Sequence, residues 1–288
     1  MQEPENAQAR GFARILHATD FAAVSELAFD HALRLALASR GHLYLVHAAK
    51  PDPDADADWS AFPGIRSTLT RWGLLAADAR TSDVADKLGL RVAKAEVGAS
   101  DTAAGVVRFA DDHKCDLLVL ATHGREGFAR LLQGSVAETL ARRAELPTLF
   151  LPLQAKGFVD PATGSASLRR ILMPVDRSAA PGAAASLVLR MADALGCADA
   201  ELHALHIGSP DTAPLVSVPP AHDARLHRHF RDGSVVDAIV EEAAALDTDL
   251  IVMPTAGHDG IMDRLMGSKT EQVLRQAGRP LLAVPLHW

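Results

Sequence analysis

Short, largely apolar runs alternate with amphipathic segments along the whole chain. In the first half the apolar runs stand at 14–19, 42–48, 91–97, 117–121 and 148–152. Runs this short, bounded by polar or turn-forming residues, predict strands that are buried on both faces. Helical spacing of apolar residues marks 25–39, 65–88 and a segment that begins at Ser100 or Asp101. Strands alternating with helices predict an α/β fold with a parallel, doubly wound sheet.

The second half of the chain repeats the first. The segment 116–152 returns at 249–285 without a gap, and these residues match: Asp116 and Asp249, Gly124 and Gly257, Gly134-Ser135 and Gly267-Ser268, Glu138 and Glu271, Pro147 and Pro280. Upstream of the second copy, the same alternation runs through 170–175, 181–195, 201–207 and 234–246. Two copies of an irregular segment in one register indicate an internal duplication, and hence two Rossmann-like domains in tandem.

We place the first domain at 1–154, a linker at 155–167 and the second domain at 168–288. The linker loses hydrophobic periodicity and gains glycine, proline and serine. The second domain is shorter, because the interval from Asp20 to Asp116 exceeds that from Asp176 to Asp249 by 23 residues. The deficit falls at 208–224, which is too rich in proline for a helix. We therefore expect one helix to be missing there, and another domain or subunit to cover the exposed sheet face.

Ligands of doubly wound sheets bind beyond the carboxyl ends of the strands, where the strand order reverses. Asp20 follows the first predicted strand and the glycine-containing loop 122–135 follows the fourth, so both lie at that edge. Ser135 and Glu138 form a capping box, which places a helix N-terminus with free N–H groups beside the loop. Such an end favours phosphate. The same residues also suit plain turns and a simple helix cap, so the spacing alone leaves both interpretations open.

These motifs resemble those of the universal stress protein family in its tandem, two-domain form, over nearly the whole chain. ATP-binding members carry G-x2-G-x9-G-S/T after the fourth strand; the matching runs are Ala121-x2-Gly124-x9-Gly134-Ser135 and Pro254-x2-Gly257-x9-Gly267-Ser268. The first glycine is replaced in both. Alanine adds one methyl group, whereas proline removes an N–H group and adds bulk. The family fold is that of the adenine nucleotide alpha hydrolases.

The resemblance implies an adenine-nucleotide site in the first half, formed by Asp20, Ala48, Ala121, Gly124, Gly134, Ser135 and Val136. In the family, the aspartate and the backbone at the Ala48 position meet adenine, and the glycine–serine positions contact phosphate. A weaker second site would use Asp176, Ile207, Gly257, Gly267 and Ser268. The implied cofactor is ATP, with or without Mg²⁺.

The charges of the two loops favour the first site. The first loop carries His123, Arg125 and Arg130 against Glu126, whereas the second carries Asp259 and Asp263 against Arg264. Acidic groups beside a triphosphate weaken its binding. Together with Pro254 and the missing helix, this predicts a nucleotide in the first half and an empty or altered second pocket.

The leading functional interpretation is a cytoplasmic stress-response module regulated by adenine nucleotide. One alternative is a tandem scaffold that binds protein partners or an apolar ligand without nucleotide, and another is a slow ATPase. No catalytic base is visible, and Gly267-Ser268-Lys269 has the wrong order for a P-loop. As in the family, the terminal strands at 147–152 and 280–285 would pair and make an internal pseudo-dimer. A homodimer and unidentified client proteins are further expectations.

The amino-acid composition limits the classes of molecule that we expect the protein to bind. The net charge is −7 without a basic block, which argues against nucleic acid, and no apolar run approaches the length of a membrane helix. The N-terminus lacks the order of a signal peptide. Two cysteines, one in each half, give no disulfide framework, which fits the cytoplasm. We expect Cys115 to be packed and Cys197, in a turn after a helix, to be exposed.

Metal sites have weak support. The alternating aspartates at 50–58 lack the glycine and glutamate of a calcium loop. His203 lies on one predicted strand, with His227 and His229 on one face of the next and His222 nearby. Zinc binding by His203, His227 and His229 is an alternative that no Cys/His spacing signature supports.

Overall fold

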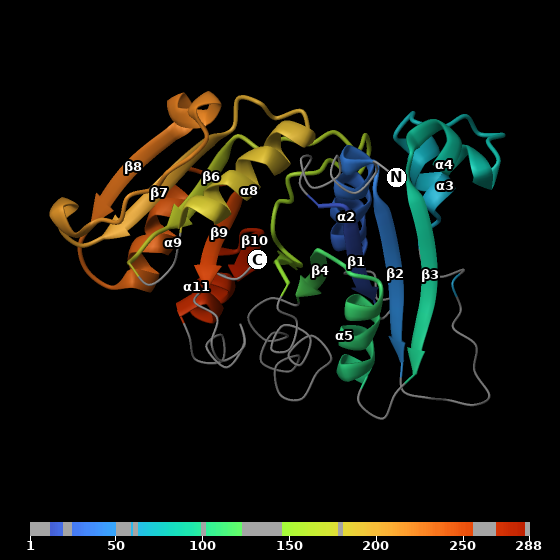
Figure 1. Cartoon of the computed structure of the whole chain (residues 1–288), viewed down its shortest axis with the longest axis horizontal. Helices are drawn as coiled ribbons and strands as arrows, with labels where there is room; N and C mark the ends of the chain where they lie inside the picture. Colours follow the sequence, from blue (N-terminus) through green and yellow to red (C-terminus); the bar gives the residue numbers. More distant parts are fainter. Residues whose placement is uncertain are drawn as a thin grey trace.

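The computed structural model describes residues 12–19, 25–49, 59, 63–98, 102–122, 146–177, 181–255 and 269–285. Its strands form one ten-stranded sheet in the order β3-β2-β1-β4-β5-β10-β9-β6-β7-β8 (Figure 1). The first half contributes β1 (Arg14–Thr19), β2 (His42–Ala49), β3 (Arg91–Gly98), β4 (Leu117–Thr122) and β5 (Thr148–Pro152). The second half contributes β6 (Arg170–Pro174), β7 (Glu201–Ile207), β8 (Leu226–Arg231), β9 (Leu250–Thr255) and β10 (Leu281–Pro285).

Each half is a parallel, doubly wound sheet, as the alternating pattern predicts. β1 pairs in parallel with β2 on one side and β4 on the other, so the strand order reverses between β1 and β4. In the second half β6 lies in the same way between β7 and β9. The two halves therefore have the same strand order, and each has its own topological switch point.

The predicted pairing of the terminal strands is confirmed. β5 and β10 run antiparallel, with Leu281 opposite Phe150 and Leu282 opposite Leu149. Both strands are buried throughout. Each half closes the strand edge that the other would leave unpaired, and the sheet continues across the junction.

Helices cover both faces of the sheet. One face carries α2 (Ser25–Ser39), α3 (Ile65–Arg71), α4 (Thr81–Leu88) and α8 (Pro181–Ala194), and the other carries α5 (Thr102–Asp112), α9 (Val235–Ala245) and α11 (Lys269–Ala277). The first group packs into a core that runs through both halves. Between α2 and α8, Arg34 Nη2 donates a 3.4 Å hydrogen bond to the carbonyl of Leu195, directly after α8.

The continuous helix expected over 65–88 is wrong. α3 ends at Arg71, and Gly73 adopts a φ of +71°, which favours glycine. Leu75 and Ala79 lie in the following turns, yet both are buried. Their helical spacing therefore reflects packing of a compact turn against the core. The Trp72 indole N–H donates a 3.0 Å bond to the carbonyl of Pro161, which ties this turn to the segment after β5.

The second sheet face, which we expected another domain or subunit to cover, is partly covered by its own half, and further cover by a subunit stays a prediction. Residues 208–225 contain two short 3-10 helices, η2 (Pro210–Thr212) and η3 (Pro220–Arg225), joined by extended chain. In that extended chain Val216 and Val218 are buried in the core shared with α8. The segment predicted to leave the face uncovered therefore adds two buried side chains to it, while its Leu215 is 82% exposed. Phe230, on the edge strand β8, remains 41% exposed.

Two matched aspartates make the duplication visible in the backbone. Asp116, just before β4, accepts hydrogen bonds from the N–H groups of Ala13 at 2.7 Å and Arg14 at 2.9 Å. Asp249, just before β9, accepts them from Arg169 at 2.7 Å and Arg170 at 2.9 Å. In each half one carboxylate fastens the start of the fourth strand to the start of the first.

The chain between β5 and β6 is tied to the first half. It forms turns and one isolated bridge between Val159 and Ala166. His31 of α2 accepts backbone bonds from Phe158 at 3.0 Å and Val159 at 3.3 Å. A Cβ at Gly157 would lie 2.3 Å from the His31 ring, so only glycine fits there. The connection between the halves is thus partly packed, although the exact division at 154 and 168 stays a prediction.

Candidate functional site

The first switch point brings together the strand ends that the sequence selected. β1 and β2 run in register up to Thr19 and His47, and β4 lies on the other side of β1. Ala48 follows His47 in β2, and Ala121 is the second-last residue of β4. Both therefore lie at the carboxyl edge on either side of β1. The remaining predicted contacts, Asp20, Gly124, Gly134, Ser135 and Val136, lie outside the described residues.

Histidine side chains fasten the strands at this edge. The His47 ring bonds through Nδ1 to the carbonyl of Thr19 at 3.1 Å, and the His17 ring bonds through Nδ1 to the carbonyl of Val119 at 3.0 Å. Because a carbonyl only accepts, Nδ1 carries the proton in both rings. The His47 ring also meets the edge of Trp59, with 6.4 Å between the ring centroids. The ends of β1, β2 and β4 are thus held in fixed register.

The second switch point has the same histidine contact, but a 3-10 turn lies over its strand ends. The His206 ring bonds through Nδ1 to the carbonyl of Val175 at 3.1 Å, which repeats the contact between His47 and Thr19. Its Nε2 lies 3.0 Å from the hydroxyl of Thr212, and Arg177 Nε donates a 3.0 Å bond to the Thr212 carbonyl. The 3-10 turn η2 is therefore fastened over the ends of β6 and β7.

This turn borders the positions expected to meet adenine in the second half. Asp176 is the second residue after β6, and Ile207 is the last residue of β7. Gly257, Gly267 and Ser268 fall outside the described part of the chain. The paired role of His47 and His206 was not predicted from the sequence. The sequence did contain an indication of it, because a histidine stands directly before Ala48 in the first copy and before Ile207 in the second.

The three histidines considered for zinc do meet on β7 and β8. His203 Nδ1 lies 2.9 Å from His229 Nε2, and the rings of His203 and His227 stack with 5.1 Å between centroids. Across the described residues, no group of three or more histidines, cysteines and acids is arranged to hold a metal. His222 lies apart and contacts Asp193 at 2.8 Å. The zinc hypothesis has no support from this geometry.

Instead, Glu242, His229 and His203 form a hydrogen-bonded row, and Glu201 lies near its far end. Buried Glu242 of α9 lies 2.8 Å from His229 Nδ1 and also bonds Arg231 at 2.7 Å. Since the carboxylate accepts, His229 Nδ1 is protonated, and its Nε2 accepts from His203 Nδ1. His203 Nε2 then faces Glu201 across 3.5 Å. Burial first, and then the neighbouring His229 and His227, lower the pKa of His203. The row fastens edge strand β8 to α9.

Both cysteines are buried free thiols, so the expected exposure of Cys197 is wrong. Its sulfur lies 3.4 Å from the N–H of Leu168 and 3.6 Å from the carbonyl of Ala166, in the chain that enters β6. Cys115 is packed as predicted, and burial, followed by the charge of Asp116, raises the pKa of its thiol to about 12.

None of the helices in the described ranges is long and apolar enough to cross a membrane.

Comparison with known proteins agrees with the duplicated fold. The sequence model of the universal stress protein family matches residues 11–152 and 220–285, more than half of the chain. A universal stress protein of Methanocaldococcus jannaschii is 29% identical over 142 residues, which are 48% of this chain and 81% of the relative.

Two solved structures share the architecture over almost their full length. A universal stress protein from Archaeoglobus fulgidus aligns with a TM-score of 0.58 at 17% identity and covers 98% of both chains. A putative universal stress protein from Pseudomonas aeruginosa aligns with a TM-score of 0.58 at 17% identity, over 96% of this chain and 95% of that one. The duplicated sequence, the doubly wound halves and the family match together establish that the chain belongs to the universal stress protein family.

Proposed function

We propose that the chain is a stress-response regulatory protein that binds one adenine nucleotide, ATP, at the carboxyl edge of its first half. Family membership supports the stress-response role. The observation that carries the nucleotide proposal is the switch point between β1 and β4, with Ala121 at the end of β4 and Ala48 at the end of β2, on the other side of β1. The glycine–serine motif follows β4 directly in the sequence.

The described part of this edge suits an anionic ligand. Ala121, which is only partly buried, adds a single methyl group where the family motif has glycine. No acidic residue occurs among the described residues that end β1, β2 and β4. In this proposal Asp20 accepts hydrogen bonds from adenine or ribose, and Gly124, Gly134, Ser135 and Val136 hold the phosphates. Mg²⁺, where bound, would neutralise phosphate charge.

Two features argue against an equal site in the second half. Thr212 and Arg177 hold η2 over the ends of β6 and β7. Pro254 replaces Ala121, and Asp259 and Asp263 add negative charge to the second loop. The proposed role for the second half is therefore structural, through the pairing of β10 with β5.

Matched substitutions in the full chain test this assignment by calorimetry with ATP. Ala121→Phe is expected to weaken ATP binding at least tenfold, whereas Pro254→Phe at the equivalent position is expected to leave it unchanged. Gly134→Asp and Gly267→Asp form a second matched pair, which places a carboxylate against the phosphates and does not alter the sheet. Equal losses within both pairs, or a larger loss from the second-half variants, would overturn the assignment. Absence of ATP binding to the unsubstituted protein would favour the scaffold alternative.

A further inference from the structure

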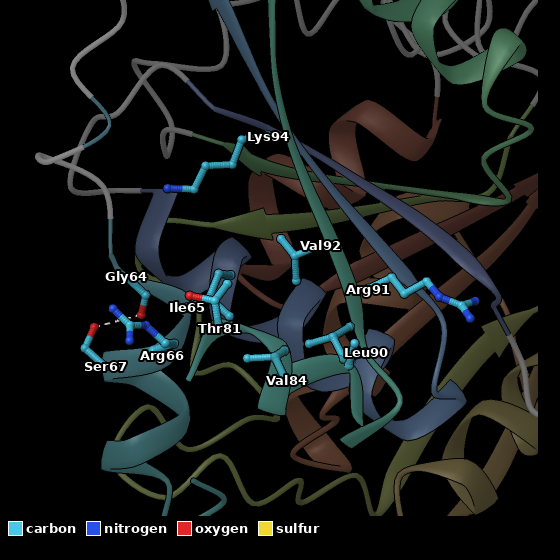
Figure 2. Close-up of a pocket in the computed structure, with 11 residues that line it drawn as sticks. Gly64, Ile65, Arg66, Ser67, Thr81, Val84, Leu90, Arg91, Val92 and Lys94 are labelled. Carbon is cyan, nitrogen blue, oxygen red and sulfur yellow. Dashed lines mark hydrogen bonds between the residues drawn. The ribbon is translucent and has the colours of Figure 1, made fainter. Parts of the chain in front are cut away.

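An open pocket of about 730 Å³ lies in the first half, between α3, α4 and β3 (Figure 2). β3 contributes its early residues, up to Lys94, and the pocket therefore lies away from the carboxyl edge where the nucleotide is proposed. Its helical wall comes from the two short helices that residues 65–88 form, with a turn between them. The volume is in the range of small-molecule sites.

The floor of the pocket is apolar and well anchored. Ile65 comes from α3, Val84 from α4 and Val92 from β3, with Leu90 just before that strand. Val84 is 6% exposed and Leu90 is 1% exposed, so both are fixed in the core below. Figure 2 shows these four side chains gathered below Lys94. Such a floor suits the hydrocarbon part of a ligand.

The rim is positively charged. Lys94 is exposed and extends its ammonium over the Trp59 ring, 4.8 Å from the centroid. No carboxylate among the described residues lies within ion-pair distance of it. Arg66 uses Nη1 to bond the carbonyl of Ala79 at 3.2 Å, which leaves other guanidinium N–H groups for a ligand. Arg91 contributes its stem, since its guanidinium points away toward His42.

No acidic residue lines this pocket among the residues that the structure describes, although the chain as a whole has a net charge of −7. The exposed hydroxyls of Ser67 and Thr81 also lie on its wall. Two cations above an apolar floor favour a ligand with one anionic head and a hydrocarbon body. We infer that this pocket binds a small amphipathic carboxylate, such as a medium-chain fatty acid, independently of the nucleotide.

Three small molecules test separately whether the pocket recognises the anionic head and the hydrocarbon body of a ligand. Octanoate, 1-octanol and acetate are titrated into the full chain below their aggregation concentrations, with calorimetry and tryptophan fluorescence as readouts. Octanoate is expected to bind at one site per chain, at least tenfold tighter than either octanol or acetate. Removing two methylenes, as in hexanoate, should weaken binding by roughly tenfold, since each buried methylene contributes about fourfold at most. Equal binding of octanol, or no binding of octanoate, would overturn the inference.

Variants assign the binding to this pocket. Lys94→Gln should weaken octanoate at least fivefold, and Ala85→Phe, which fills the pocket from an exposed position on α4, should abolish binding. Lys87→Gln is the matched control, because Lys87 lies on the same helix, pairs with Asp83 and does not line the pocket. All three change exposed residues, and circular dichroism verifies their folding. Octanoate affinity unchanged in Lys94→Gln or Ala85→Phe, or competition by ATP, would contradict the proposed location.

Discussion

The two halves of the sheet are fastened in the same way and differ in the connection after the second strand. In both, an aspartate before the fourth strand bonds two backbone N–H groups, and a histidine of the second strand bonds the carbonyl at the end of the first. After β2 the first half builds α3 and α4, whereas after β7 the second half builds two 3-10 turns and an extended segment. The duplicated frame is thus independent of the chain that covers it.

The covering chain has different consequences in each half. In the first, the turn between α3 and α4 leaves a pocket with a cationic rim. In the second, Val216 and Val218 fill the core and Thr212 closes over His206. The comparison indicates that duplication preserved the register of the strands, while the connections after the second strand, which tolerate change, diverged.

The largest expected effect concerns a contact that only one half has. His31 of α2 donates from Nδ1 to the Leu27 carbonyl at 2.7 Å and accepts from Phe158 and Val159. Leu187 lies the same distance after Asp176 as His31 lies after Asp20, and it is fully buried. The substitution His31→Leu makes the first half resemble the second at this position. It leaves the buried N–H groups of Phe158 and Val159 unpaired, which should lower the unfolding free energy by about 3 kcal/mol. Urea denaturation measures it; a loss below about 1 kcal/mol would contradict the role given to this contact.

The stability difference between His31→Leu and the unsubstituted protein should depend on pH. Complete burial lowers the pKa of His31 to about 4. Because the unfolded chain takes up this proton near pH 6.5 and the folded chain does not, the stability that His31 contributes is present above pH 6.5 and falls as the pH drops toward 4. The deficit of His31→Leu should therefore shrink by about 2 kcal/mol between pH 7 and pH 5.

The difference in unfolding free energy between His31→Leu and the unsubstituted protein reports the ionisation of His31 alone. Burial raises the pKa of Asp30 and of Asp116 to about 6, so these carboxyls add stability as the pH falls through the same window. Their contributions occur in both proteins and cancel in the difference. A deficit that stays constant between pH 7 and pH 5 would show that His31 ionises freely in the folded state.

A smaller effect should be equal in the two halves. Asp116→Ala and Asp249→Ala each remove both carboxylate oxygens and leave two backbone N–H groups without their acceptor, at a cost of about 1–2 kcal/mol each. Denaturant unfolding should report similar losses for both, and an additive loss for the double variant because the sites are separate. A loss in one half only would break the proposed equivalence.

The smallest effect concerns the second edge alone. Thr212→Val removes the hydroxyl that meets His206 and should cost about 1 kcal/mol. Hydrogen exchange at 208–213 should increase, while exchange at the end of β2 stays unchanged. Unchanged exchange at 208–213 would show that the Thr212 side chain does not fasten η2.

The regular part of this fold was predictable because short buried strands leave a strong pattern. The strands at 201–207 and 117–122 lie where the pattern placed them, within a residue. The pairing of the terminal strands was expected from the family resemblance, and its antiparallel direction was not predicted. The turn after Arg71 was missed because apolar residues packed in a turn can have the same spacing as a helical face. Val216 and Val218 were overlooked because a proline-rich segment can still bury alternate residues when extended.

Contacts between distant segments were the least predictable. Cys197 is buried because Ala166 and Leu168 pack against it, and nothing in its local sequence indicates this. His203, His227 and His229 were correctly placed together from strand periodicity. Their environment, however, depends on Glu242, which comes from α9 and has no pattern linking it to the strands. Of the proposed nucleotide site, the sequence pattern indicated the edge of the sheet and the family resemblance indicated Ala48 and Ala121, which lie on the strands on either side of β1.

The central claim is that one half of a duplicated frame binds ATP and the other does not. Native mass spectrometry of the freshly purified full chain, with ATP added in excess, counts bound nucleotides directly. The account predicts one ATP per chain, lost in Gly134→Asp and retained in Gly267→Asp. Two ATP molecules per chain, or one that survives Gly134→Asp and disappears in Gly267→Asp, would contradict it.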